Sequence, residues 1–361
     1  MNILVISTVR YRSNGISNVI RNIYLNDTFK EDDISFLFPG DNDAAMVEEL
    51  EQKGFKVYQF PRYEQGTLAY FRYVKKLVKK DNIEIVHVHG NSHALIVELL
   101  ASKMGGCKIR ICHSHNTTCN NTVMHKVLAP FFNILCTERL ACGKAAGRWM
   151  YGNKPFQIIN NGINTEKFRF SNKDRNLIRK QYGITENEIV IGHVGNLNIQ
   201  KNQKFLIDVV KEIIKYQPCK CMLVGEGDKL SELQEQVKIL NLTEFVIFCG
   251  VTNNVPAFLS AMDIIVMPSL YEGLPLALIE EQANGLICYV SDCITREANV
   301  TGNVNFISIE KREKVWADTI INGLHNYNRA NTSDEAIRII CKKGYSINHE
   351  AKKLKQVYQN K

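Results

Sequence analysis

The sequence predicts an α/β protein of two domains, each built on a parallel sheet flanked by helices. Short apolar runs alternate with segments of helical periodicity along the 361 residues, and this alternation is typical of parallel sheets. The same rhythm restarts after residue 165, and a chain of this length has room for two cores. We therefore expect one domain over residues 1–165 and a second from residue 166 onward.

Composition excludes several classes of protein. No apolar run approaches the ~18 residues of a transmembrane helix, and the start, MNILVISTVR, lacks the basic region of a signal peptide. The 11 cysteines show no paired C-x2-C clusters, which indicates reduced core residues of a cytoplasmic protein. The net charge is +8, with nine Lys and Arg against three Asp and Glu over residues 70–126. Without an RNA or helix-turn-helix motif we expect no nucleic acid, whereas an anionic membrane stays open.

The first half begins as nucleotide-type α/β domains do. The apolar run Ile3 to Ile6 enters a loop containing Asn14 and Gly15, and a helical pattern follows. The fingerprint G-x-G-x-x-G is absent, which argues against a NAD enzyme. Further strands are expected at 34–38, 55–59, 83–88, 108–112, 139–143 and 156–160.

Two segments of this half favour a surface role without deciding it. The predicted helix over 67–80 carries an apolar stripe among basic residues, so it fits a membrane surface or an ordinary solvated face. The segment Thr122 to Cys136 is apolar, with a predicted break at Pro130. It is too short to span a bilayer. It fits an acceptor-side helix, a membrane-dipping helix or plain core.

Histidines gather at the ends of two predicted strands. His87 and His89 end one strand, and His113 and His115 end the next. Catalytic groups of open α/β sheets collect at the carboxyl ends of strands. A metal is also conceivable, but H-x-H without a nearby carboxylate is weak evidence for one, so we expect no metal site.

The second half repeats the pattern with an anion site near its start. A strand over 188–194 leads into the loop 195–203 and a helix over 202–216, with Lys201 at its N-terminal entrance. A helix N-terminus beside a Lys suits a diphosphate, although a plain surface Lys is common there. Later strands are expected at 221–224, 245–248, 263–267 and 287–290, and helices at 230–240, 310–325, 333–343 and 349–360.

The segment PSLYEGLPLALIEEQANG, residues 268–285, carries the most chemistry. Gly273 supplies a turn, and Pro275 suits the first helical position. Glu272 would then stand beside the free N–H groups of Gly273 and Leu274. Glu280 is expected on an apolar helix face, where an unpaired carboxylate is costly and a hydroxyl-rich ligand would serve as partner. The alternative is a capped helix with solvated acidic residues.

This segment resembles the Glu-x7-Glu signature of the retaining glycosyltransferases of family four. EGLP and the NG after the helix stand at the family's positions, and residues 158–168 resemble its interdomain linker. The resemblance implies the GT-B fold, with two facing Rossmann-like domains and an interdomain cleft. It also implies that a final helix, 346–361, returns to the first domain, which leaves 166–345 as the nucleotide-sugar domain.

The resemblance assigns roles around the donor. Glu272, with the amides of Gly273 and Leu274, would hold the sugar. Glu280 would accept from the ribose, and Val251 would contact the nucleobase through its backbone.

It also assigns roles around the reacting bond. Lys201 would clamp the diphosphate, but Asn196 stands where the family has a second cation, an Arg. His115 would lie beside the sugar, with His113 as the rival by a two-residue slip. Gly15 occupies a loop where the family has a glycine pair, and a plain turn stays an alternative.

The function implied is transfer of a hexose from a nucleotide sugar, with UDP-sugar favoured, to a lipid-linked or glycan acceptor, with retention. Capsular or exopolysaccharide synthesis is the expected setting, in the cytoplasm or on the inner face of the plasma membrane. No cofactor and no metal are expected. A catalytically silent relative that binds a nucleotide sugar or a partner enzyme, and a sugar-nucleotide epimerase, are the alternatives.

Overall fold

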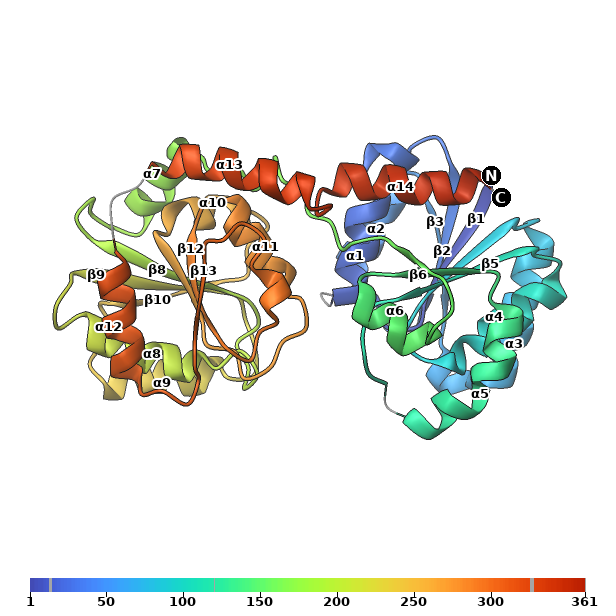
Figure 1. The fold of residues 1–361 in the computed structure, drawn as a ribbon, viewed down its shortest axis with the longest axis horizontal. Helices are drawn as coiled ribbons and strands as arrows, with labels where there is room; N and C mark the ends of the chain where they lie inside the picture. Colours follow the sequence, from blue (N-terminus) through green and yellow to red (C-terminus); the bar gives the residue numbers. More distant parts are fainter. Residues whose placement is uncertain (13–14, 120, 325–327, 361) are drawn as a thin grey trace. The chain divides into compact units, whose positions relative to one another are not determined.

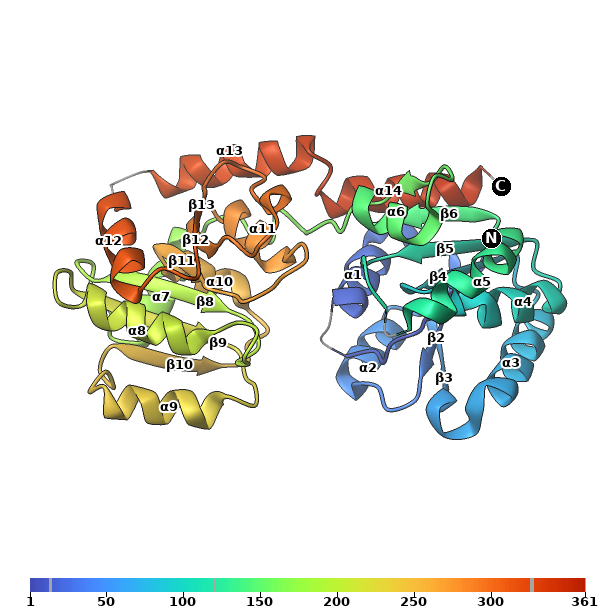
Figure 2. The same cartoon turned by 60° about the horizontal axis from the view of Figure 1, so that its bottom comes forward.

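The computed structural model describes residues 1–12, 15–119, 121–324 and 328–360. The predicted turn residue Asn14, and His325 at the end of a predicted helix, lie outside these ranges. The chain divides into two compact units (Figures 1 and 2). Unit 1 comprises Met1–Gly162 and Gly344–Lys361, and unit 2 comprises Ile163–Lys343. Within the described residues, no helix combines the length and the apolar character needed to cross a membrane.

Unit 1 holds a seven-stranded parallel sheet of order β3-β2-β1-β4-β5-β6-β7. Its strands are β1 (Asn2–Ser7), β2 (Asp33–Pro39), β3 (Lys56–Phe60), β4 (Ile85–His89), β5 (Ile109–Ser114), β6 (Glu138–Ala141) and β7 (Gln157–Ile158). Its helices are α1 (Gly15–Tyr24), α2 (Ala44–Gln52), α3 (Arg62–Lys80), α4 (Ile96–Gly105), α5 (Thr122–Leu135), α6 (Lys144–Tyr151) and α14 (Ile347–Gln359), with short 3₁₀ turns η1 (Asp27–Phe29) and η2 (His93–Leu95).

Strand parity decides which side chains of β4 meet which helices. Val86 and Val88 belong to the apolar cluster formed with α3, α4, α5 and α6. Successive side chains of a strand point to opposite faces, so His87 and His89 point to the other face. There His87 meets Tyr24 of α1 and Tyr358 of α14.

Helix α14 completes unit 1 after the chain has built unit 2. It lies alongside α1 (Figure 1). The Tyr358 hydroxyl lies 2.6 Å from that of Tyr24, and Lys355 pairs with Asp32 at 2.8 Å. The buried Glu350 carboxylate accepts the backbone N–H of Asn160. These contacts explain why the chain's last helix belongs to the first sheet.

Unit 2 holds a six-stranded parallel sheet of order β10-β9-β8-β11-β12-β13. Its strands are β8 (Ile189–Val194), β9 (Cys219–Val224), β10 (Val246–Gly250), β11 (Ile264–Met267), β12 (Ile287–Ser291) and β13 (Val304–Ile307). Its helices are α7 (Asn172–Gln181), α8 (Gln203–Ile213), α9 (Leu230–Ile239), α10 (Val255–Ala261), α11 (Leu276–Ala283), α12 (Glu313–Gly323) and α13 (Arg329–Lys342), with the 3₁₀ turn η3 (Arg296–Ala298). In open sheets of this order, ligands bind at the carboxyl ends of the strands where the order reverses. Here that point lies between β8 and β11.

Several predicted boundaries shift for local reasons. Pro275 precedes α11 as its N-cap, with ψ of 112°, so the prediction of a first helical position was one residue early. Gly66, at φ 81° and ψ 168°, separates a first turn of α3 from the predicted helix. The predicted break at Pro130 is wrong, because α5 continues through it.

Candidate active site

The loop between β11 and α11 holds the first predicted carboxylate, Glu272. Its side chain is only 10% exposed, although the loop itself lies at the surface, with Tyr271 and Gly273 exposed. Among the described residues, no carbonyl or side chain accepts the backbone N–H groups of Gly273 and Leu274. Free N–H groups just before a helix favour an anion or a polar ligand oxygen.

Lys201 forms an ion pair with Glu272, at 2.6 Å between Nζ and Oε1. The Lys201 side chain is 15% exposed. Its backbone N–H donates to Asn198 Oδ1 at 2.9 Å, and Asn202 follows in the left-handed region at φ 55°. The loop after β8 therefore turns sharply and delivers a half-buried cation to the loop after β11.

Three hydrogen bonds hold these two loops together. Leu270 N–H donates to the Gln200 carbonyl at 2.8 Å, and the Gln200 side chain donates to the Tyr271 carbonyl at 2.9 Å. The Asn202 side chain donates to the carbonyl of Pro268 at 3.2 Å. The ion pair is thus part of a fixed arrangement and not a chance meeting of long side chains.

The second predicted carboxylate, Glu280, lies on α11 and is partly exposed. Burial raises its pKa to about 7, against a smaller lowering by Lys167. No described residue donates a hydrogen bond to its carboxylate. A ligand with hydroxyl groups would meet an acceptor there that the protein itself does not use.

Glu281 is the fully buried acid of this helix, which the sequence did not indicate. It is 0% exposed, and neither carboxyl oxygen has a partner among the described residues. Burial raises its pKa well above the usual range, although Lys201 acts in the opposite direction. We predicted from the sequence that Glu280 lies on the apolar face. For Glu281 we considered only a solvated position. The available signal was its three-residue spacing from the buried Leu278.

Asn196 lies exposed after β8, beside an open hollow of ≈ 570 Å³. Asn198, Glu226 and Gly227 also line this hollow. At Gly227 an added Cβ would lie 2.1 Å from the Leu197 carbonyl oxygen, so only glycine lets the loops after β8 and β9 approach this closely. None of the described residues that line the hollow is basic, which matches the absence of the expected Arg.

A buried histidine, His193, supports the loop that bears Lys201 through hydrogen bonds, and sequence reasoning missed it. His193 Nδ1 lies 2.9 Å from the Val266 carbonyl of β11. Its Nε2 lies 3.0 Å from the side-chain nitrogen of Gln203, which also donates to the Asn196 carbonyl. The position of His193 inside a predicted strand was the only available signal.

Val251 stands in a loop as predicted, whereas Gly15, which was predicted in a loop, begins helix α1. Val251 is 67% exposed directly after β10. Gly15 is the exposed first residue of α1 in unit 1, and an added Cβ there would meet nothing within 4 Å. Space alone therefore does not require glycine at this position.

His115 lies just beyond β5 in unit 1 and is partly buried. Its backbone N–H donates to Asn91 Oδ1 at 2.9 Å, and its Nε2 lies 2.8 Å from Nδ1 of His89. Burial lowers its pKa to about 4, so the ring is neutral at physiological pH. The rival His113 is 0% exposed inside the sheet. Of the two, His115 is the one that a ligand can reach.

The predicted site residues divide between the units. Gly15 and His115 belong to unit 1. Unit 2 holds Asn196, Lys201, Val251, Glu272, Gly273, Leu274 and Glu280. Within unit 2 the structure brings Lys201 and Glu272 into contact at the end of the sheet where ligands of such folds bind.

Comparisons with known proteins agree on one family. Residues 174–339 match the family described as "Glycosyl transferases group 1". The chain is 30% identical over 324 residues to EpsF of Bacillus subtilis (strain 168), an alignment that covers 85% of this chain and 83% of that protein. It is 28% identical over 305 residues to the UDP-Gal:alpha-D-GlcNAc-diphosphoundecaprenol alpha-1,3-galactosyltransferase of Escherichia coli, covering 78% and 77%. It is 26% identical over 341 residues to the capsular polysaccharide biosynthesis glycosyltransferase CapH of Staphylococcus aureus, covering 88% of each.

A solved structure matches the whole chain. The crystal structure of Anabaena Alr3699/HepE in complex with UDP superposes with a TM-score of 0.79 at 18% identity and covers 100% of both chains. The same protein has been solved with UDP-glucose, at a TM-score of 0.76.

Proposed function

Because this chain belongs to the group 1 glycosyltransferases, we propose that it transfers a hexose from a UDP-sugar to a lipid-linked saccharide with retention of anomeric configuration. Its fold is GT-B, as the sequence predicted. The observation that carries the proposal is the contact of Lys201 with Glu272 beside the backbone N–H groups of Gly273 and Leu274, for which no described residue is an acceptor. The same loops thus offer a cation for a diphosphate and a carboxylate for sugar hydroxyls.

The transfer asks the protein for charge stabilisation and positioning. Negative charge grows on the departing diphosphate, and preorganised donors aimed at it lower the barrier. Lys201 and the free N–H groups at Gly273 and Leu274 would supply these donors. This set neutralises the leaving group without a metal, so we propose that the transfer needs none.

The nucleoside end has its own acceptor. Glu280 has no hydrogen bond from the described residues, and its pKa is about 7. When ionised, it would accept from the ribose hydroxyls in charge-assisted hydrogen bonds. The backbone after Gly250, at the exposed Val251, would meet the base.

The donor and acceptor classes follow from the relatives. HepE binds UDP and UDP-glucose. The E. coli relative acts on a diphosphoundecaprenol-linked sugar, and CapH serves capsular polysaccharide biosynthesis. We infer the same classes here: a UDP-sugar donor, a polyprenyl-linked acceptor, and a product destined for a capsule or exopolysaccharide.

The exposed face of α5 supports the proposal that the protein binds a membrane surface. Its apolar side chains are each 49–72% exposed and fall within one helical face: Val123, Met124, Val127, Phe131 and Ile134. We call these five the α5 apolar face. Such an exposed patch marks an interaction site.

Exposed basic residues lie on α5 and on the helix that packs against it. Lys126 of α5 and Lys103 of α4 are exposed, and α4 packs against both α5 and the basic α3. Arg110 is not part of this charge, because it is buried and donates to backbone carbonyls. An exposed apolar helix face combined with exposed cations on the same and the adjacent helix fits an anionic lipid surface. We propose peripheral binding at the inner face of the plasma membrane.

Transfer is tested with purified protein, UDP-sugars and a polyprenyl-diphosphate-linked sugar. The expected result is a product that forms only when donor and acceptor are both present, with the donor's α configuration retained by NMR. Conversion of the donor without acceptor would indicate an epimerase. UDP binding without turnover of any donor would indicate a catalytically silent relative.

Membrane binding is tested by co-sedimentation with anionic vesicles. Val127→Asp combined with Ile134→Asp should reduce binding at least about tenfold, and binding of the native protein should fall as salt rises. Leu177→Asp, at a 59% exposed position of α7, is the matched control. Absence of native binding at low salt would refute the lipid surface as partner.

A further inference from the structure

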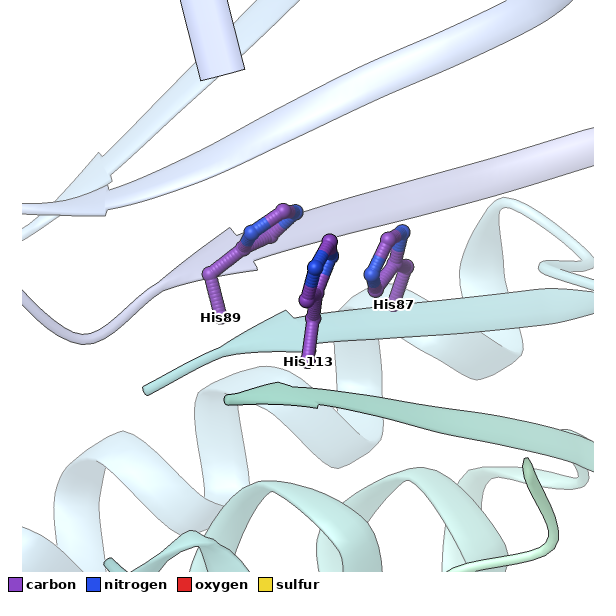
Figure 3. A group of neighbouring side chains, drawn as sticks. All are labelled: His87, His89 and His113. Carbon is purple, nitrogen blue, oxygen red and sulfur yellow. The ribbon is translucent and has the colours of Figure 1, made fainter. Parts of the chain in front are cut away.

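Three buried histidines of unit 1 form a cluster that the transfer reaction does not use. His87 and His89 come from the end of β4, and His113 comes from the end of β5. His89 and His113 are register partners, and strand parity puts His87 on the same face. Figure 3 shows the three rings side by side on that face. Each is 0% exposed.

Three ring nitrogens of this cluster have no partner among the described residues: Nε2 of His87, Nε2 of His89 and one nitrogen of His113. The other nitrogen of His113 is hydrogen-bonded to the backbone of Ile159. Buried polar atoms in native proteins are almost always hydrogen-bonded, because leaving them unpaired costs free energy. A cluster of unpaired imidazole nitrogens therefore calls for a missing partner.

The remaining nitrogens are held by neighbours. His87 Nδ1 lies 2.6 Å from the Tyr358 hydroxyl and 3.0 Å from the Tyr24 hydroxyl. Donation from Nδ1 to a hydroxyl oxygen leaves the lone pair on Nε2 free. His89 Nδ1 is in contact with His115 Nε2 at 2.8 Å. Metal-bound histidines show the same division, with one nitrogen on the metal and the other fixed by an outer partner.

We propose that His87, His89 and His113 bind one divalent transition-metal ion of the Zn²⁺ type. Their ligand atoms all lie within 4.8 Å of one another. Neutral imidazoles suit Zn²⁺, Co²⁺, Ni²⁺ and Cu²⁺, whereas Mg²⁺ and Ca²⁺ require oxygen ligands that this set lacks. Three histidines leave a fourth position of a tetrahedral ion for water.

Binding requires the rings to turn as well as to close, because an imidazole lone pair lies in the plane of its ring and near-parallel rings do not point at one centre. Bonds of about 2.0–2.1 Å to a tetrahedral ion bring ligand nitrogens to about 3.4 Å apart. The rings of His87 and His113 now lie 5.4 Å apart between centroids and 7° from parallel. His113 keeps one nitrogen on the backbone of Ile159 and has the other free to turn toward the ion. The ion would then link β4 to β5 and, through Tyr358, to α14.

The site is tested on the full-length chain after chelator treatment and dialysis. Titration with Co²⁺ should give one equivalent bound, with the visible absorption of a tetrahedral nitrogen-ligated ion. Zn²⁺ should displace the Co²⁺ and raise the Tm. His113→Gln and His89→Gln should each lower metal affinity at least about 100-fold, whereas His349→Gln, at an exposed position, should leave it unchanged.

Two outcomes would overturn the proposal. One is a chelator-treated native protein that binds no Co²⁺ or Zn²⁺ at tens of micromolar and shows no Tm shift. The other is unchanged stoichiometric binding by folded His113→Gln and His89→Gln. If the variants do not fold, a Zn²⁺ titration of the native protein, followed by the NMR signals of its histidines, tests the proposal instead. Signals of His87, His89 and His113 must shift together at one equivalent of Zn²⁺. Sugar transfer is not the readout, so failure of the proposed function would leave this test intact.

Discussion

Replacing Glu272 by Gln should strengthen the binding of UDP while it abolishes sugar transfer. In the unliganded protein, Glu272 holds Lys201 at 2.6 Å. A diphosphate that takes Lys201 must first break this pair. Glu272→Gln removes the competing charge, so UDP meets a free cation. The donor sugar, however, loses the carboxylate that would orient it, and turnover falls.

The magnitude follows from the distance and the burial. Two unit charges 2.6 Å apart interact by about 6 kcal/mol at an effective dielectric constant of about 20. Desolvation of side chains that are only 15% and 10% exposed offsets most of this. The ion pair then has a net stabilisation of about 1–3 kcal/mol. Removing it by Glu272→Gln should make UDP bind about 5- to 150-fold more tightly.

Isothermal titration with UDP measures the effect on native protein, Glu272→Gln, Lys201→Ala and the double variant. Lys201→Ala should weaken the binding of UDP. The double variant should bind UDP no more tightly than Lys201→Ala, because the gain in affinity from Glu272→Gln requires the lysine. Glu226→Gln, which removes a negative charge from the neighbouring hollow without touching Lys201, is the matched control. A loss of UDP affinity in Glu272→Gln equal to that in Lys201→Ala would refute this account of the loops.

Three further results are expected. Burial raises the pKa of the Glu281 carboxyl above its value in the unfolded chain. The Glu281 side chain therefore contributes fully to the free energy of unfolding below the unfolded pKa of about 4.3. This contribution falls by about 1.4 kcal/mol per pH unit as the pH rises toward the folded pKa. Glu281→Met should therefore be more stable than native protein at pH 8 by about 1–3 kcal/mol in urea unfolding, and an equal pH dependence in both proteins would contradict this. Because the Glu280 pKa is about 7, UDP affinity should rise between pH 6 and 8 by up to about tenfold, and a Glu280→Gln variant with the same rise would exclude Glu280 as the titrating group. Asn196→Arg should keep or raise the transfer rate by restoring a cation near the diphosphate, whereas a large loss of rate would mean that the diphosphate lies elsewhere.

The sequence predicted the alternating fold and the loop that bears Lys201, because periodicity and strand ends carry that information locally. It could not tell whether Glu280 or Glu281 would be buried. Consecutive helical residues are about 100° apart, and only the packing of α11 against β12 and α13 decides which of them turns inward. For the same reason α5 stayed ambiguous. Its composition fits either core or surface, and the helix buries His125, Phe132 and Leu135 while leaving an equally apolar face outside.

The histidines show a similar limit. H-x-H at two strand ends was visible in the sequence, and parity predicts that such residues share a face. That His113 is left with one nitrogen unpaired among the described residues could not be predicted, because it depends on what α1 and α14 present to that face. The hydroxyls of Tyr24 and Tyr358 both go to His87.

The order in which the two units occur along the chain constrains how the protein can be synthesised. Unit 2, Ile163–Lys343, is complete as a stretch of sequence before the ribosome has made α14. Until then unit 1 lacks the helix whose Tyr358 contacts His87 and Tyr24, so the part of its sheet that α14 covers emerges unprotected. We expect the second unit to fold during translation while the first waits in a chaperone-dependent state. Chains truncated after residue 343 should accordingly resist protease in unit 2 and remain sensitive in unit 1.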